Sequence, residues 1–226
     1  MELTYDGRGL VLGDTLVVAD CHVGRGTGGE LEFPVGSGAD MVERFRDLVE
    51  RHDPADVVLA GDLLHSFQTV PRTVETTVAG LQSACRDAGA RLIVTPGNHD
   101  TMLSSVWDGP TEQEYCVGDT VVLHGHEAPE VDADRYVVGH DHPTIEIEGQ
   151  RRPCYLVGAD QYCGSDVVMV PSFNKLNAGV RVNTMSAGDF QSPLVTDVDR
   201  LSPVVWDEHA RETKEFPPLG EFRRML

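Results

Sequence analysis

At 226 residues the chain is long enough to bury the core of one α/β domain, and 40% of its residues are hydrophobic. No apolar run reaches about 18 residues, which excludes an ordinary transmembrane helix and a membrane partner. The net charge of −19, from 37 acidic and 18 basic residues, repels polyanions at low ionic strength. The acidic stretch Met1–Asp6 has none of the features of a secretory signal, so we expect a cytoplasmic protein.

Lysine is rare in this chain, which contains only Lys175 and Lys214. An acidic, lysine-poor surface suits molar salt, where a Debye length of about 3 Å screens self-repulsion. We therefore predict a halophilic source, with a specific cationic partner as the alternative. The five cysteines include no Cys-x-x-Cys pair, so no disulfide framework is predicted. Cys21 is expected to be a buried thiol rather than a metal ligand.

The first hundred residues alternate strand-like and helix-like patterns. Apolar runs predict four strands, at residues 8–12, 15–19, 56–60 and 91–95. Apolar residues at helical spacing predict helices over 39–51 and from Pro71 to about Ala88. The glycine-rich segment Gly24–Gly38 is predicted to be a long loop that either lines a site or is simply mobile. This order predicts a layered α/β fold with right-handed crossovers.

After Asp100 the pattern changes to short strands without long helices between them. These strands are predicted near residues 114–118, 120–123, 135–139, 144–148, 153–157 and 167–171. They indicate a second, more antiparallel sheet packed on the first. Residues 1–200 are expected to form one domain. The polar residues 201–226 show no clear period and are expected to form a loosely packed C-terminal tail on, or extending from, that domain.

Side chains that bind metals or transfer protons follow five of the strand-like runs. They are Asp20, His22, Asp62, Asn98, His99, Asp100, His124, His126, His140 and His142. Because sites in open α/β sheets form at the carboxyl ends of strands, we expect these side chains to converge. Asp20 and His22 are two residues apart at a strand end, so both are predicted to leave on one face. A lone histidine of this kind is usually structural, but five such clusters in one chain predict a metal site.

The residue types also restrict the choice of metal. The carboxylate of Asp62 has two oxygens and can bridge two cations. Mixed nitrogen and oxygen ligands without a thiolate fit Mn²⁺, Fe²⁺ or Zn²⁺ better than Ca²⁺ or Mg²⁺. We therefore expect divalent cations of this kind.

The ordered pattern Asp-x-His, Gly-Asp, Gly-Asn-His-Asp, His-Gly-His and Gly-His-x-His resembles that of the calcineurin-like metallophosphoesterases. The resemblance covers residues 16 to about 142. It implies a four-layer α/β/β/α sandwich, with two packed mixed sheets flanked by helices. It also implies phosphate-ester hydrolysis by a bridging hydroxide at a dinuclear centre, with Mn²⁺ as the favoured metal.

Carried over position by position, the resemblance implies two overlapping sets of ligands. One metal would bind Asp20, His22, Asp62 and His142, and the other would bind Asp62, Asn98, His124 and His140. His124 is preferred to His126 because the ligand histidine of the family precedes the glycine. His99 would not bind a metal; it would protonate the leaving oxygen or stabilise the charge that develops there.

Other residues are weaker candidates. Asp100 would hold the imidazole of His99, with a helix N-cap as the alternative. Arg25, His65 and His126 are candidate substrate-binding residues, although Arg25 also suits a solvated loop and the two histidines suit indirect support of the metals. Lys175 is expected to lie on the surface.

The segments Asp62–Ser66 and Val170–Lys175 look like those of SbcD-related or ICC-like archaeal phosphoesterases. That branch also includes bacterial endonucleases, so the resemblance adds nucleic acid as a substrate class. We expect a phosphodiesterase; the alternatives are a phosphomonoesterase on small metabolites and a non-catalytic, metal-bound scaffold. The sequence itself shows no basic stripe or aromatic platform for nucleic acid, and it does not indicate the oligomeric state.

Overall fold

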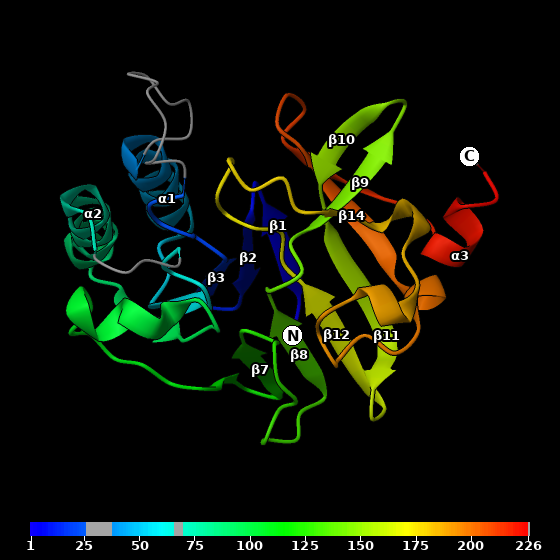
Figure 1. Ribbon diagram of the computed structural model, residues 1–226, viewed down its shortest axis with the longest axis horizontal. Helices are drawn as coiled ribbons and strands as arrows, with labels where there is room; N and C mark the ends of the chain where they lie inside the picture. The colour runs from blue at the N-terminus through cyan, green and yellow to red at the C-terminus, as the bar shows by residue number, and fades with distance from the viewer. Residues whose placement is uncertain (26–37, 66–69, 226) are drawn as a thin grey trace.

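The computed structural model describes residues 1–25, 38–65 and 70–225. The first half of the chain forms a five-stranded sheet (Figure 1). Its strands, in spatial order, are β1 (Leu3–Asp6), β2 (Gly9–Leu12), β3 (Thr15–Ala19), β4 (Asp56–Ala60) and β5 (Arg91–Thr95). The first three strands are antiparallel, and β3, β4 and β5 are parallel. Most of the predicted loop Gly24–Gly38 lies outside the described residues.

Two helices cover the outer face of this sheet, α1 (Gly38–His52) and α2 (Arg72–Ala88). Each buries the apolar side predicted from its spacing, such as Phe45 of α1 and Leu81 of α2. Gly89 ends α2 in the left-handed conformation, with φ of 76°, which glycine adopts without strain. No helix among the described residues has the length and apolarity that crossing a bilayer requires.

A seven-stranded mixed sheet forms the second half of the chain. Its order is β15 (Glu212–Glu215), β14 (Ser202–Asp207), β11 (Tyr155–Tyr162), β12 (Ser165–Met169), β8 (Arg135–Val138), β7 (Thr120–Leu123) and β6 (Tyr115–Val117). The pairs β7–β8 and β8–β12 are parallel, and the other neighbours are antiparallel. A small third sheet contains β10 (Gln150–Pro153), β9 (Pro143–Ile147) and β13 (Val180–Arg181).

The two large sheets pack face to face through a shared apolar core. Side chains such as Val17 and Val58 of the first sheet meet Val137 and Val168 of the second. Tyr155 is almost fully buried there, and its hydroxyl donates a hydrogen bond of 2.6 Å to the carbonyl of Gly9. A strand that is covered on both faces carries apolar residues on both, which explains the continuous apolar runs in the sequence.

Short helices cover the outer face of the second sheet. These are the 3-10 helices η2 (Val182–Thr184), η3 (Ala187–Asp189) and η4 (Val198–Arg200), with α3 (Leu219–Phe222). Their apolar side chains, including Val198 and Leu219, pack on Leu156 and Val205. The predicted α/β sandwich is therefore confirmed, with a last layer of short turns rather than long helices.

The C-terminal residues differ from the loosely packed tail that we expected. The strand β14 lies between β11 and β15 in the second sheet. Val204 faces the core between the two sheets, and Val205 faces the core on the outer side. Because both faces of β14 are covered, its apolar residues do not alternate with polar ones, and the charged residues that follow obscure the strand in the sequence.

We expect Val204→Asp to lower the free energy of unfolding by about 3–5 kcal/mol, because it leaves an unpaired charge in the core. Val204 is 4% exposed, whereas Val131 is 44% exposed, so Val131→Asp is the matched control. Urea unfolding followed by circular dichroism measures both variants. Equal stability of the two variants would show that residues 201–226 contribute little to the fold.

Candidate metal centre

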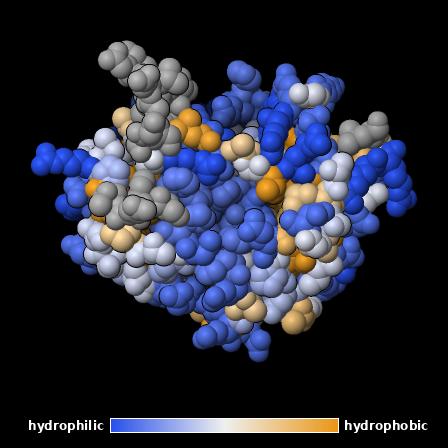
Figure 2. Space-filling view, viewed as in Figure 1, coloured by the Kyte–Doolittle hydropathy of each residue, from blue (hydrophilic) through white to orange (hydrophobic). Residues whose placement is uncertain are grey.

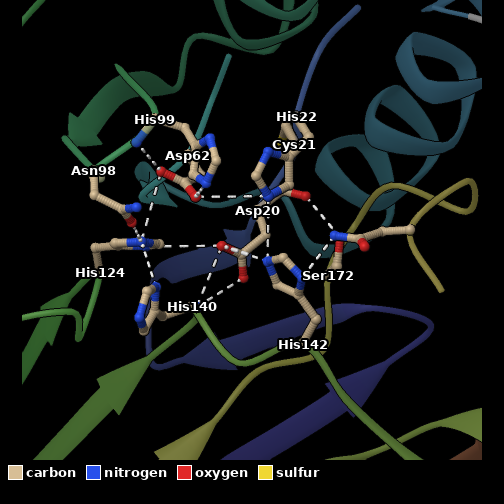
Figure 3. Close-up of polar contacts among 12 residues, drawn as sticks. Asp20, Cys21, His22, Asp62, Asn98, His99, His124, His140, His142 and Ser172 are labelled. Atoms are coloured by element: carbon tan, nitrogen blue, oxygen red, sulfur yellow. Dashed lines mark hydrogen bonds and ion pairs between the residues drawn. The ribbon is translucent and has the colours of Figure 1, made fainter. Parts of the chain in front are cut away.

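Polar side chains from five strand ends meet at one place between the two large sheets (Figure 3). Those on the first sheet follow β3, β4 and β5, and those on the second follow β7 and β8. The seven predicted ligands that come together are Asp20, His22, Asp62, Asn98, His124, His140 and His142. The bridge between Ala19 and Ser172 joins the end of β3 to the segment that follows β12 beside this place.

The first group of donor atoms lies around Nε2 of His142. This nitrogen is 3.1 Å from Oδ1 of Asp20 and 3.2 Å from Nε2 of His22. Nε2 of His22 is in turn 3.6 Å from Oδ2 of Asp62. The ligand atoms of Asp20, His22 and His142 all lie within 4.8 Å of one another, a spacing that suits one metal ion.

The second group lies around Nε2 of His124. This nitrogen is 3.1 Å from Oδ1 of Asn98, 3.1 Å from Nδ1 of His140 and 3.6 Å from Oδ1 of Asp62. Asp62 therefore directs one carboxylate oxygen toward each group, as a bridging ligand would. Its Oδ1 also accepts a hydrogen bond of 2.9 Å from the backbone N–H of His99, which fixes the carboxylate.

Burial sets the protonation of these groups. Asp20 and Asp62 are 0% and 2% exposed, and burial raises the pKa of Asp62 to about 7 and also raises that of Asp20. Burial lowers the pKa of His22 to about 3, of His124 to about 2 and of His140 to about 4. These three imidazoles are therefore neutral at pH 7 and offer lone pairs rather than positive charge.

The donor set fits a divalent metal. Two buried carboxylates lie among four imidazoles, three of which burial keeps neutral, whereas Asp20 and Asp62 raise the pKa of His142 against the effect of its burial. A buried carboxylate without a compensating cation is costly. Among the described residues, the buried Nδ1 of His22 has no hydrogen-bond partner. Oxygen and nitrogen donors without a thiolate are the ligands of Mn²⁺, Fe²⁺ and Zn²⁺. Cys21 is fully buried, and burial raises the pKa of its thiol, in agreement with its predicted structural role.

The backbone brings the ligands together differently from the extended geometry that we expected. The strands β3 and β8 end at Ala19 and Val138, before the ligands begin. Five ligands then have a left-handed backbone: Asp20 (φ 53°), His22 (φ 39°), Asp62 (φ 45°), His140 (φ 72°) and His142 (φ 50°). Residues other than glycine rarely adopt this conformation, and strained backbones of this kind concentrate at functional sites.

Two glycines leave space for these ligands. A Cβ on Gly61 would lie 2.0 Å from Nδ1 of His124, and a Cβ on Gly97 would lie 2.2 Å from Oδ1 of Asp62. Both distances are below any real contact, so each glycine permits the ligand of a neighbouring loop to reach the centre. In the pairs Gly61-Asp62 and Gly97-Asn98, the glycine thus leaves space for a ligand from another loop, and the next residue is itself a candidate ligand.

Asp100 has partners other than the one we expected. Its carboxylate accepts hydrogen bonds from the backbone N–H groups of Leu63 (3.2 Å), Leu64 (2.8 Å) and Gly97 (2.9 Å). These contacts join the loop after β4 to the loop after β5. Asp100 is the first residue of the 3-10 helix η1 (Asp100–Ser105), so it is not an N-cap. Its role in holding the imidazole of His99 stays a prediction.

His99 lies at the open side of the centre. Its side chain is 38% exposed, and its Nε2 is 4.0 Å from Oδ2 of Asp62. The ring of His65 stacks on it, with centroids 6.2 Å apart. The ligand atoms of His22, His65 and His99 also lie within 4.8 Å of one another, a grouping that the sequence did not suggest.

The other candidate substrate-binding residues surround the centre. The backbone N–H of Arg25 donates a hydrogen bond of 3.1 Å to the carbonyl of His22. Burial lowers the pKa of both His22 and His65, and the charge of Arg25 adds to this effect. The ring of His126 lies 5.1 Å from that of His124 and 6.0 Å from that of His140. His124, rather than His126, is the histidine that contacts Asn98, as the preference for His124 requires.

Sequence reasoning missed the residues that support the ligands from the segment Val170–Asn177. Ser172 donates to the carbonyl of Asp20 (2.8 Å), and Asn174 donates to the carbonyls of Cys21 and His22 (2.9 and 3.0 Å). The side-chain nitrogen Nδ2 of Asn177 lies 2.7 Å from Nδ1 of His142 and 3.3 Å from the hydroxyl of Ser172. This contact fixes the orientation of the His142 ring beside Asp20. The motif-like run Val170–Lys175 was the available signal.

Residues 14–127, half of the chain, match the family model of the calcineurin-like phosphoesterases. The chain belongs to the calcineurin-like phosphoesterase family. The matched range ends before His140 and His142, which complete the two donor groups. No curated protein matches the chain.

A solved structure supports the fold assignment. The nuclease MPE of Pseudomonas putida is 20% identical to the chain, and the match covers 88% of each chain with a TM-score of 0.60. At this identity the likeness concerns the fold. Family membership and the converging donors make this calcineurin-like protein a metal-dependent phosphoesterase, a hydrolase of phosphate esters.

We expect Asn177→Ala to weaken Mn²⁺ binding by about 10–100-fold, because residues that orient a ligand histidine have effects of this size. Calorimetric titration of the metal-free protein measures the affinity. Asn183→Ala is the control, since Asn183 makes two hydrogen bonds to the backbone of Glu146, away from the centre. This control should lose stability but keep its affinity. Unchanged affinity in Asn177→Ala would refute its orienting role.

Proposed function

We propose that the chain is a phosphodiesterase that works with two divalent metal ions, Mn²⁺ being the favoured metal. The observation that carries this proposal is the division of seven donors into two groups that share Asp62. Asp20, His22, Asp62 and His142 would hold one ion. Asp62, Asn98, His124 and His140 would hold the other. Bound metal ions would supply Lewis acidity toward the phosphate and lower the pKa of water.

The residues of the chain account for the other parts of the reaction. The hydrogen bond from the N–H of His99 and the loop contacts of Asp100 hold Asp62 in place. Arg25 is the candidate that attracts the substrate phosphate. In the hydrolysis, water gives up a proton to solvent and its oxygen forms a bond to phosphorus, while the bond to the leaving oxygen breaks. His99 donates its Nε2 proton to that leaving oxygen and regains a proton from solvent.

Diester substrates, including the phosphodiester bonds of nucleic acid, are the class that we propose. Support comes from the resemblance of two segments to the SbcD-related branch and from the shared fold of a solved nuclease. The exposure of His99 leaves room for a bulky leaving group on that side. A phosphomonoesterase and a metal-bound scaffold are the outcomes that would replace this proposal.

Mn²⁺-dependent hydrolysis of bis-p-nitrophenyl phosphate should occur in high salt and stop on addition of EDTA. Asp62→Asn should reduce the rate by at least about a hundredfold, because the bridging carboxylate becomes a neutral amide. The rate of p-nitrophenol release measures this, with p-nitrophenyl phosphate assayed in parallel. Cleavage of the monoester alone would indicate a phosphatase. No turnover in protein that binds two metals would indicate a scaffold.

His99→Ala should lower the rate of diester hydrolysis by about 10²–10⁴-fold while both metals remain bound, as expected for loss of a general acid. Metal content is measured by elemental analysis of the same preparation. His209→Ala, at an exposed histidine outside the centre, is the control and should keep full activity. A loss of less than tenfold in His99→Ala with metal still bound would contradict the proposed role.

A further inference from the structure

Two pockets of opposite charge flank the candidate metal centre. The pocket on the His142 side has a volume of about 170 Å³ and contains Arg8, Arg151 and Lys175 in its wall, but no acidic residue. The pocket on the His124 side has a volume of about 560 Å³ and contains Glu114, Glu127 and Glu130 in its wall, but no lysine or arginine. A pocket wall with three basic residues and no acidic one is unexpected by chance, because the chain has 37 acidic residues and only 18 basic ones.

The basic groups of the pocket beside His142 are held by main-chain and neutral groups. Nη1 of Arg8 donates to the carbonyls of Ser172 and Asn174, at 2.7 and 3.1 Å. Arg151 donates through Nε to the hydroxyl of Thr144 and through Nη2 to the carbonyl of Gly179, at 2.7 and 2.6 Å. These contacts fix the two guanidinium groups without neutralising their charge.

The positive charge of this pocket is also unpaired. Ion pairs involve other arginines, such as Arg181 with Glu146 and Arg200 with Asp160. Over residues 1–25, 38–65 and 70–225, no carboxylate forms an ion pair with Arg8, Arg151 or Lys175. Arg8 and Lys175 also line a neighbouring pocket that contains Asp6, Asp47 and Glu208, whereas none of these carboxylates lines the pocket beside His142. Guanidinium and ammonium groups without an ion-pair partner are suited to bind phosphate oxygens.

The pocket is continuous with the metal centre through His142 and Ser172. His142 is a candidate metal ligand, and Ser172 holds the backbone of Asp20. Hydrophilic residues cover the middle of the face shown in Figure 2, and the β9–β10 hairpin that carries Arg151 lies at one side of it (Figure 1). A substrate held at the metals can therefore extend into this pocket.

We propose that the pocket formed by Arg8, Arg151 and Lys175 binds a second phosphate group of the substrate, one that is not cleaved. The substrate class is then a nucleotide or nucleotide chain with a flanking phosphate on the His142 side. The three glutamates on the His124 side repel phosphate, so the substrate crosses the centre in one direction. This inference rests on the proposed function and adds a substrate feature to it.

The experiment compares substrates with and without the second phosphate. Thymidine 5′-(p-nitrophenyl phosphate) is compared with its 3′-phosphorylated form, and thymidine 3′-(p-nitrophenyl phosphate) with its 5′-phosphorylated form. In one pair the added phosphate should lower KM by about tenfold, the effect of one charge-assisted contact. Arg151→Gln and Lys175→Gln should each reduce this advantage, while hydrolysis of bis-p-nitrophenyl phosphate is unchanged.

The chain offers matched controls for both substitutions. Arg152 is the neighbour of Arg151 on β10 and donates to Gln150. Lys214 is the other lysine of the chain and pairs with Asp207. Arg152→Gln and Lys214→Gln make the same charge changes outside the pocket and should keep the full advantage. The inference is overturned if the added phosphate lowers KM in neither substrate pair, or if this advantage survives in both Arg151→Gln and Lys175→Gln.

A binding measurement tests the pocket independently of activity. Inorganic pyrophosphate is titrated calorimetrically into dialysed, metal-free protein at the lowest salt that keeps it folded. Wild type should bind pyrophosphate about tenfold more tightly than Arg151→Gln or Lys175→Gln. Arg152→Gln and Lys214→Gln should bind it as tightly as wild type. Equal binding by all five proteins would overturn the pocket. If bis-p-nitrophenyl phosphate is not hydrolysed, the proposed function fails and this titration alone decides the pocket.

Discussion

The burial of two carboxylates that have histidines, but no lysine or arginine, as partners among the described residues is the constraint on which the rest of this structure depends. Asp20 and Asp62 lie between two packed sheets, where charge is poorly solvated. Around them the chain provides four imidazoles and an amide oxygen, arranged in two groups. A cluster of this composition is stable as a set of charges only with cations between its members, which agrees with the metal dependence of the calcineurin-like family.

Maintaining that cluster explains several features that otherwise look unrelated. Five ligands have a left-handed backbone, which residues other than glycine rarely adopt. Gly61 and Gly97 make room for ligands from neighbouring loops, and Asp100 joins the loops after β4 and β5 through their N–H groups. The segment after β12 holds the end of β3 from the opposite sheet. The glycines leave space for the ligands, and the contacts of Asp100 and Ser172 hold the backbone of the ligand loops in place.

Much of this arrangement could be predicted from the sequence because its signals are local. The apolar runs located the central strands, and the polar residues directly after them marked the edge where they meet. Other parts depend on contacts between distant segments. Val204 and Val205 face different cores, so β14 has no alternating pattern. Asn177 meets His142 only in the fold. Arg8, Arg151 and Lys175 are far apart in the chain, so the charged pocket has no sequence motif.

The distribution of the donors over both sheets has a consequence for how the protein matures. His124, His140 and His142 belong to the second sheet, and the residues that hold Asp20 and His142 in place, Ser172 and Asn177, follow later still. During synthesis the first sheet and its helices can form while only two carboxylates, His22 and Asn98 are present. The full centre arises after most of the chain has left the ribosome. Chains that end before β7 carry three of the four proposed ligands of one ion and two of the four of the other, so the proposed two-ion centre can be completed only late in maturation.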